Sequence, residues 1–401
     1  MRVGLDRLPS LDHLTRELAS KRVALLAHPA SVDASYRHIS GVLASLGIRP
    51  KIVFGPEHGY GGEAQDMVGV HDAVDSNGTR VVSLYGETFA DLIPSDAHLT
   101  DIDILLIDLA DVGSRYYTFI WTALLCVRKA AARGVQTIIL DRPNPLGGVL
   151  TEGALVEPGF ESFVGLEPVP VRHALTLGEI VAHFAARDGL ALGESGALRI
   201  VSCENLGRDD TAFDWDRPFA TTSPNMPTAD TALVYPGGCL IEGTNLSEGR
   251  GTTRPFELVG APFIDGARLA GDLAASKLPG FVARPLTFMP MFQKHAKKIC
   301  GGVQIHVTDR RAFRPYATYL ALVAAAYAQA PEQFAFRTEK YEFIDTIPAF
   351  DLLTGSAMAR DAIVKGEPLE AWLESIAAAP ADWAEAIRVA AHLAARAGVS
   401  G

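Results

Sequence analysis

Four short polar segments of the chain carry the residue types that could do chemistry. The first, Pro56-Glu57-His58-Gly59, directly follows an apolar run. A carboxyl group at the end of a buried strand is shielded from water, which suits Glu57 to general acid catalysis with His58 beside it. The glycines that follow let a ligand approach the backbone closely. The structural alternative is a turn in which Glu57 caps backbone groups and His58 is simply hydrogen-bonded.

The second segment runs from Asp111 to Thr118 and follows an apolar run that contains Asp108. Arg115 is the obvious ion-pair partner for one of the two aspartates. The sequence leaves two interpretations open, a structural ion pair and a functional site, because an aspartate here could hold a substrate hydroxyl or act together with Glu57. The third segment, Asp141 to Gly148, follows a further apolar run.

The fourth segment, Glu242 to Arg254, holds two Glu, two Arg, one Asn, one Ser and three Thr within 13 residues. An ordinary turn needs far less polarity, so we expect this segment to face a ligand. Arg250 or Arg254 could bind a substrate carboxylate through two parallel hydrogen bonds. The sequence around Ser247 lacks the first glycine of the G-x-S-x-G pattern, which makes a nucleophilic serine a weaker alternative.

These segments must be positioned by the elements around them. Five apolar runs, at residues 22–29, 51–55, 80–85, 103–109 and 136–140, alternate with helical patterns at residues 36–46 and 117–133. Such alternation is typical of an α/β fold whose parallel sheet is covered by helices on both faces. The chemistry of such a fold lies at the carboxyl ends of the strands, where the first three polar segments fall. We therefore expect these three loops to lie close together.

The rest of the chain indicates a second, smaller domain. A helix at residues 176–187 and a strand at 198–203 complete the first domain, and residues 221–230 resemble a crossing loop. We place the boundary near Leu233, which gives a first domain of residues 1–232 and a smaller α+β domain of residues 233–401. The second domain is expected to contain helices at 265–276 and 313–328 and a strand at 302–307, whereas residues 235–254 contain few good helix formers.

Composition excludes several classes of function. With 36 Lys and Arg against 47 Asp and Glu, the formal charge is −11, which disfavours nucleic acids and anionic membranes as partners. The cysteines form no C-x-x-C pair, the histidines show no H-x-x-x-H spacing, and no G-x-x-x-x-G-K-[ST] loop is present. We therefore expect neither a metal nor an organic cofactor. Because no apolar leader or membrane-spanning stretch is found, we expect a cytoplasmic protein.

Taken together, the four segments resemble the NamZ-type exo-β-N-acetylmuramidases, a family long known only as a domain of unknown function. The resemblance extends from Val3-Gly-Leu-Asp-Arg7 to Asp351-Leu-Leu-Thr-Gly355. It implies a Rossmann-like N-terminal domain, a smaller C-terminal domain and an active site in the cleft between them. It also implies a glycoside hydrolase that releases N-acetylmuramic acid from the non-reducing end of peptidoglycan fragments. Because no export signal is found, we expect a role in cell-wall recycling. Family members often carry Gln where this chain has Ala110.

The resemblance makes Glu57 the catalytic residue, and we expect it to be the general acid. Glycosidases normally use two carboxyl groups, and the candidates for the second are Asp111, Glu242 and Glu248. Arg250 or Arg115 is expected to bind the lactyl carboxylate of the substrate. Further substrate contacts are expected from Tyr116, Asn144, Thr244 and Asn245. The alternatives are a sugar-binding protein that does not cleave its ligand and a serine esterase. The sequence carries no signal for an oligomeric state.

Overall fold

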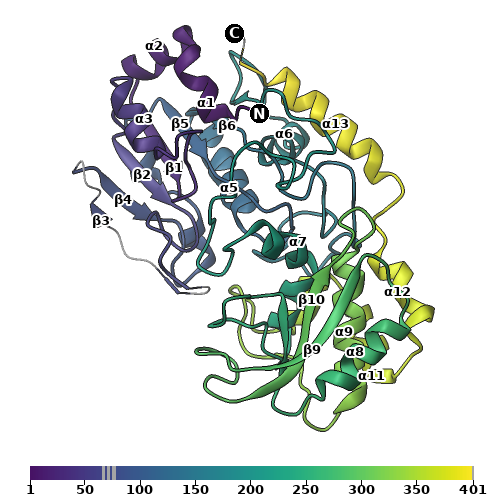
Figure 1. Ribbon diagram of the computed structural model, residues 1–401. Helices are drawn as coiled ribbons and strands as arrows, with labels where there is room; N and C mark the ends of the chain where they lie inside the picture. The colour runs from purple at the N-terminus through teal and green to yellow at the C-terminus, as the bar shows by residue number, and fades with distance from the viewer. Residues whose placement is uncertain (66–67, 70–72, 75–77, 400–401) are drawn as a thin grey trace.

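The computed structural model describes residues 1–65, 68–69, 73–74 and 78–399 (Figure 1). A seven-stranded sheet forms the centre of the first domain, in the order β3-β4-β2-β1-β5-β6-β7. Its strands are β1 (Val23–Ala27), β2 (Ile52–Gly55), β3 (Ala73–Val74), β4 (Arg80–Ser83), β5 (Ile104–Asp108), β6 (Gln136–Leu140) and β7 (Leu198–Val201). All neighbouring pairs are parallel except β3 with β4. The predicted α/β fold with a parallel sheet is confirmed.

The two faces of this sheet are covered by different helices, as the continuous apolar strands require. Leu25 and Leu106 point to the face that packs against α2 (Asp12–Ser20) and α3 (Ile39–Ser45). Leu26 and Leu105 point to the opposite face, which is covered by α5 (Phe119–Ala132) and α6 (Leu177–Arg187). The short helices of this domain are α1 (Gly4–Arg7) and α4 (Asp96–Leu99), with single 3₁₀ turns at Leu8–Ser10 and Phe89–Leu92.

The second domain is built on a smaller antiparallel sheet in the order β8-β10-β9. Its strands are β8 (Leu258–Ala261), β9 (Phe281–Phe288) and β10 (Cys300–Val307). Its helices are α8 (Gly266–Ala275), α9 (Pro315–Gln329), α10 (Ala349–Thr354), α11 (Met358–Lys365) and α12 (Leu369–Ala377). The helix expected at residues 313–328 is present as α9, which carries no charged residue and is largely buried. In the part of the chain that the structure describes, no helix has the length and apolar character needed to cross a bilayer.

The structure does not divide simply into two domains at Leu233, for two reasons. Helix α7 (Ala229–Gly238) spans this position, although Pro236 and two glycines make it a poor helix by sequence. Tertiary packing explains the helix, because a side chain at Gly237 would overlap the Pro315 carbonyl of α9. Helix α13 (Trp383–Arg396) returns to the first domain and lies along α6 (Figure 1). Beyond this helix, Val399 N donates to Ile200 O of β7.

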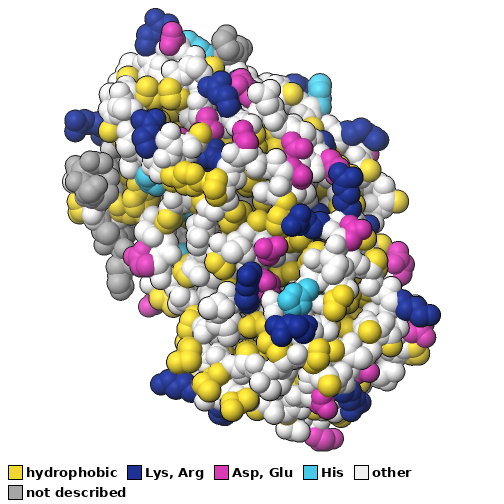
Figure 2. Space-filling view, viewed as in Figure 1, with side chains coloured by type: hydrophobic (Ala, Val, Ile, Leu, Met, Phe, Trp, Pro, Cys, Tyr) yellow, Lys and Arg dark blue, Asp and Glu magenta, His cyan; other side chains and the backbone are white. Residues whose placement is uncertain are grey.

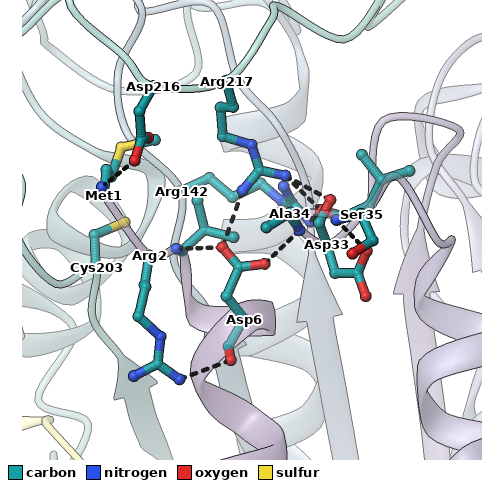
Figure 3. Close-up of polar contacts among 12 residues, drawn as sticks. Met1, Arg2, Asp6, Asp33, Ala34, Ser35, Arg142, Cys203, Asp216 and Arg217 are labelled. Carbon is teal, nitrogen blue, oxygen red and sulfur yellow. Dashed lines mark hydrogen bonds and ion pairs between the residues drawn. The ribbon is translucent and has the colours of Figure 1, made fainter.

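A polar cluster ties Arg217, just before the crossing loop, to residues at the carboxyl ends of the central strands (Figure 3). Arg217 Nη1 donates to Asp6 Oδ2 at 2.9 Å, and Asp6 Oδ1 accepts from Ala34 N at 2.7 Å. Arg142 Nη2 donates to Asp108 Oδ2 at 2.8 Å. Doubly wound folds commonly bind nucleotides at such strand ends. In this protein the segment just before the crossing loop, with Trp215, Arg217 and Phe219, lines a small cavity at these strand ends.

Candidate active site

A narrow pocket lies where the two domains meet. On the side shown in Figure 2, the domains are in contact and charged side chains of both signs gather near their junction. The first domain contributes Glu57, His58, Tyr116, Tyr117, Thr118, Phe119, Val164, Ser223, Asn225 and Met226 to the pocket. The second contributes Tyr235, Glu242, Arg250, Phe256, Tyr341 and Glu342. The first and fourth polar segments therefore share one pocket, although they are almost 200 residues apart in the sequence.

The turn after β2 holds Glu57 at the wall of this pocket. Gly59 N donates to Pro56 O at 2.9 Å, and both His58 and Gly59 have positive φ angles, of 69° and 82°. The turn is so tight that a side chain at Gly55 would overlap the backbone of Tyr60. Glu57 is only 6% exposed. A carboxyl group is thus kept away from bulk water at the carboxyl end of a central strand, as the sequence predicted.

Two polar contacts orient the residues of this turn. Thr118 Oγ1, at the start of α5, donates to Glu57 Oε2 at 2.8 Å. His58 Nδ1 lies 2.8 Å from Ala64 O. Because a carbonyl oxygen accepts only, Nδ1 carries the proton, and Nε2 of a neutral His58 is then an acceptor. The Thr118 contact also joins the first and second polar segments, which were expected to lie close together.

Glu242 is held in the pocket by a cation and a phenol. Arg250 Nη2 donates to Glu242 Oε1 at 2.6 Å, and Tyr341 OH donates to Glu242 Oε2 at 2.8 Å. The Arg250 guanidinium lies over the Phe256 ring, with its carbon 5.1 Å from the centroid. These charge-assisted contacts favour an ionised Glu242. As a result, the Arg250 guanidinium is already bound to carboxylates of the protein itself.

Glu248 is placed in an ion-pair network beside the pocket. Its Oε1 accepts from Arg250 Nε at 2.9 Å, and its Oε2 lies 2.8 Å from Lys294 Nζ. Burial acts to raise the pKa of Glu248, but the charges of Lys294 and Arg250 outweigh it and hold this pKa below the usual value. Glu248 is therefore suited to orient Arg250 and is a poor proton donor.

Sequence reasoning missed a further carboxylate at the pocket, Glu342. Tyr85 OH of the first domain donates to Glu342 Oε2 at 3.1 Å. Both Glu342 and Phe343 have positive φ angles, of 44° and 72°, which is costly for residues other than glycine. Phe343 packs against Tyr85 and Phe163 of the first domain. Nothing in the sequence near Glu342 marks it, because neither an apolar run nor a glycine pattern surrounds it.

Asp111, the first residue of the second segment, is buried but does not line the pocket of Glu57. Its Oδ2 accepts from Gly113 N at 2.7 Å and lies 3.9 Å from His173 Nε2. Burial raises the pKa of Asp111 to about 7. It lines a separate small cavity beneath the crossing loop, which makes it less suitable than Glu242 as a second catalytic carboxylate.

Arg115 and Asn144 have structural partners rather than positions in the pocket. Arg115 is fully buried, and its guanidinium donates to the carbonyl oxygens of Ala154, Val169 and Leu353. It therefore ties the two domains together, and its burial keeps it from a substrate carboxylate. Asn144 Nδ2 donates to Leu175 O, and its Oδ1 accepts from Leu146 N.

Tyr116 does line the pocket, and its hydroxyl donates to Pro236 O at 3.1 Å. Ser247 is only 2% exposed and is not among the residues that line the pocket. Its Oγ accepts from Gly249 N at 3.1 Å, as in a local turn. The geometry therefore offers no support for the serine esterase alternative. Within the described ranges, no group of three or more His, Cys, Asp and Glu side chains could hold a metal ion.

Thr244 and Asn245 line a larger groove that adjoins the pocket and shares Glu242 with it. The Thr244 hydroxyl donates to Ile241 O at 2.9 Å. Asn245 also bonds to the neighbouring segment, since its Nδ2 donates to Gln333 O and its Oδ1 accepts from Ala335 N. The sequence thus identified one segment of the groove, while the segment that pairs with it was not predicted.

Both halves of the chain are similar to known proteins. Residues 23–230 match the family model described as exo-β-N-acetylmuramidase NamZ, N-terminal, and residues 233–391 match the corresponding C-terminal model. The chain is 39% identical over 372 residues to the peptidoglycan β-N-acetylmuramidase NamZ of Bacillus subtilis (strain 168), which covers 92% of this chain and 86% of that protein.

Two solved structures share the fold. A DUF1343 family protein of Bacteroides fragilis NCTC 9343 matches with a TM-score of 0.83 and 27% identity over 98% of both chains. A second DUF1343 family protein of the same organism matches with a TM-score of 0.70 and 23% identity, over 99% of this chain and 98% of that one. With both halves matched by its models, the chain belongs to the NamZ family of exo-β-N-acetylmuramidases.

Proposed function

We propose that this protein hydrolyses the glycosidic bond of a terminal β-N-acetylmuramyl unit in peptidoglycan fragments, with Glu57 as the proton donor. The observation that carries the proposal is that Glu57 and the Glu242–Arg250 pair, from the two domains, line one pocket. Two carboxyl groups in different surroundings are what glycoside hydrolysis requires. The name of the Bacillus subtilis relative supplies the substrate class.

The surroundings of the two carboxyl groups favour different roles. Glu57 is buried at the wall of the pocket and receives a hydrogen bond from the Thr118 hydroxyl, and we assign it the role of proton donor to the leaving oxygen. Glu242 receives hydrogen bonds from the Arg250 guanidinium and from Tyr341, which keep it ionised. Glu242 would then act as the second carboxylate, either on the sugar carbon or on a water molecule. Arg250 acts mainly to hold Glu242, since a substrate carboxylate would have to compete with it.

The proposal is tested by Glu57→Gln, which keeps the shape of the side chain but removes its acid. We expect the release of N-acetylmuramic acid from a chromogenic β-N-acetylmuraminide to fall by roughly 10²–10⁴-fold, as for loss of a general acid. Glu63→Gln is the matched control, because Glu63 is exposed in the same loop and does not line the pocket. Turnover by Glu57→Gln close to that of the unaltered protein would reject Glu57 as the acid. A protein that only binds sugars would release nothing in any variant.

We further propose that the enzyme acts in the cytoplasm. All four cysteines are free thiols, and Cys126, Cys239 and Cys300 are buried, which is the usual state in a reducing compartment. Cell fractionation with compartment markers would test this location.

A further inference from the structure

The pocket that Glu57 and Glu242 line is too small for a sugar in this structure. Its volume is about 40 Å³, whereas sites for small molecules commonly have volumes of roughly 300–1,000 Å³. Part of the pocket wall must therefore move before a monosaccharide unit can reach the two carboxyl groups. A wall segment suited to such movement combines an unfavourable backbone conformation with side-chain contacts that can be released together.

A tight turn of the second domain, residues 341–344, has this unfavourable conformation. Tyr341 N donates to Ile344 O at 2.8 Å, and Ile344 N donates to Tyr341 O at 2.9 Å. The two residues between them, Glu342 and Phe343, have φ angles of 44° and 72°. Turns with two positive φ angles normally contain Gly, Asn or Asp, because other L-residues adopt this conformation at an energetic cost. We call residues 341–344 the latch.

Side chains of the first domain hold the latch in this conformation. Between ring centroids, Phe343 lies 5.7 Å from Tyr85 and 6.2 Å from Phe163. The Phe89 ring is nearly perpendicular to that of Phe343, at 6.3 Å. Tyr85 OH also donates to Glu342 Oε2 at 3.1 Å. Aromatic pairs and hydrogen bonds of this kind are favourable, so these contacts offset the cost of the strained turn.

The latch forms the part of the pocket wall that lies beside Glu242. Glu342 is only 5% exposed and lines the pocket together with Val164 of the first domain. Tyr341, at the start of the latch, also lines the pocket and donates to Glu242 Oε2 at 2.8 Å. Movement of Glu342 and Phe343 away from the first domain would therefore widen the pocket beside the proposed catalytic groups.

Strain and contacts have opposite effects on the free energy of the latch. In the closed state the contacts with the first domain are made and the turn is strained. In the open state these contacts are lost, but the turn is free to adopt ordinary φ values and to release its two backbone hydrogen bonds. Because the two effects oppose each other, the states can lie close in free energy, and a ligand that fits only one of them can shift the population.

We propose that residues 341–344 are an autoinhibitory latch, which occupies part of the sugar site in the free protein and is displaced when the terminal sugar binds. The inference rests on the proposed function, because the carboxyl groups beside the latch are the proposed catalytic pair. Binding then includes the cost of opening the latch, so the apparent affinity for the sugar is lower than that of the open form. A change that weakens the closed state should lower KM without a matching change in kcat.

The first experiment alters the latch and measures hydrolysis of p-nitrophenyl β-N-acetylmuraminide. Phe343→Ala removes the ring that packs on the first domain, and Phe343 is not among the described residues that line the pocket. Phe343→Tyr keeps the ring and is the conservative variant. Phe281→Ala is the matched control, because Phe281 is a half-buried ring of the second domain that packs against Phe313, away from the pocket lining.

We expect Phe343→Ala to lower KM by about threefold or more while kcat changes less than about twofold, because the cost of opening is reduced. Phe343→Tyr and Phe281→Ala should keep the KM of the unaltered protein. Loss of a merely structural contact would instead raise KM or lower kcat. A KM that is unchanged or raised in Phe343→Ala would overturn the proposal, and so would an equal fall in the Phe281 variant.

The second experiment does not depend on turnover. Hydrogen–deuterium exchange of backbone amides is measured in the unaltered protein with and without saturating N-acetylmuramic acid, the proposed product. We expect the product to accelerate exchange at Tyr341 and Ile344, whose mutual hydrogen bonds are lost on opening, and to leave the buried helix α9 unchanged. Unchanged or slower exchange in the latch would overturn the proposal. Faster exchange without hydrolysis by any variant would reject the proposed function alone, and the latch would then belong to a sugar-binding protein.

Discussion

Thr118 and Glu57 are joined by a hydrogen bond that crosses over an intervening strand. Glu57 follows β2 and Thr118 follows β5, and β1 lies between these strands in the sheet. Nevertheless Thr118 Oγ1 donates to Glu57 Oε2 at 2.8 Å. The loops after the two strands therefore bend toward each other, and the hydroxyl at the start of α5 fixes the rotamer of the proposed catalytic carboxyl group.

We expect Thr118→Val to lower kcat while the fold is retained, because the change removes one hydroxyl and keeps the shape of the side chain. As Glu57 gives up its proton it becomes a carboxylate, and a hydrogen bond to a charged group contributes about 1.5–3 kcal/mol. If it is lost in the transition state, kcat falls roughly 10- to 100-fold. Thr118→Ser restores the hydroxyl and should recover most of the activity. Equal activity of the Val and Ser variants would contradict a role for the Thr118–Glu57 contact.

Arg250→Met is expected to be strongly destabilising, because it leaves the buried Glu242 and Glu248 without a shared cation. Breaking a buried ion pair from one side costs about 3–5 kcal/mol. Lys294→Met is the comparison, and we expect a smaller loss, because Glu248 then keeps its bond to Arg250. Urea denaturation of the three proteins measures the difference. A Lys294 variant that is less stable than the Arg250 variant would show that Arg250 is not the central cation of the network.

Tyr341→Phe and Tyr85→Phe together identify the second carboxylate. The first removes the hydroxyl that donates to Glu242, and the second removes the one that donates to Glu342. Each change should cost about 1 kcal/mol of stability. If Glu242 is the second carboxylate, kcat should fall about tenfold in the Tyr341 variant and much less in the Tyr85 variant. The reverse order, measured with the same chromogenic substrate, would assign the role to Glu342.

Because Asp111 is buried, we expect the stability of the folded protein to decrease as pH rises. Burial raises the pKa of Asp111 to about 7, whereas an aspartate in an unfolded chain has a pKa of about 3.9. Between these values the folded protein holds a proton that the unfolded chain has lost. The free energy of unfolding therefore falls with rising pH, by up to about 1.4 kcal/mol per unit for each such group.

Asp111→Asn should reduce this slope between about pH 5 and pH 7, as measured by denaturation at several pH values. Asp103→Asn is the control, because hydrogen bonds and charge from Arg22 hold the pKa of Asp103 well below its usual value. Asp103 is thus ionised in both states across the window and adds no slope. An unchanged slope in the Asp111 variant would mean that other buried carboxyl groups, such as Asp141 and Glu152, whose pKa values burial raises to about 7, cause the effect.

The strands and the first polar loops could be predicted because each is encoded locally. The run Lys51–Gly55 became β2, and the polar turn after it placed Glu57 at the sheet edge. Helix α7 was not predicted, since Pro236 and its neighbouring glycines favour a loop until α9 packs against them. Arg115 was expected in the site because its sequence neighbours are polar, but its partners are carbonyl groups up to 238 residues away.

By itself, the sequence determined the parallel sheet, the family and the chemical identity of the groups at the strand ends, because apolar periodicity and motif spacing are properties of neighbouring residues. The tertiary structure alone decided that Glu57, Glu242 and Glu342 line one pocket and that Arg250 is bound to protein carboxylates. These relations depend on how two domains pack and on which buried charges must be neutralised, and contacts between distant residues determine both.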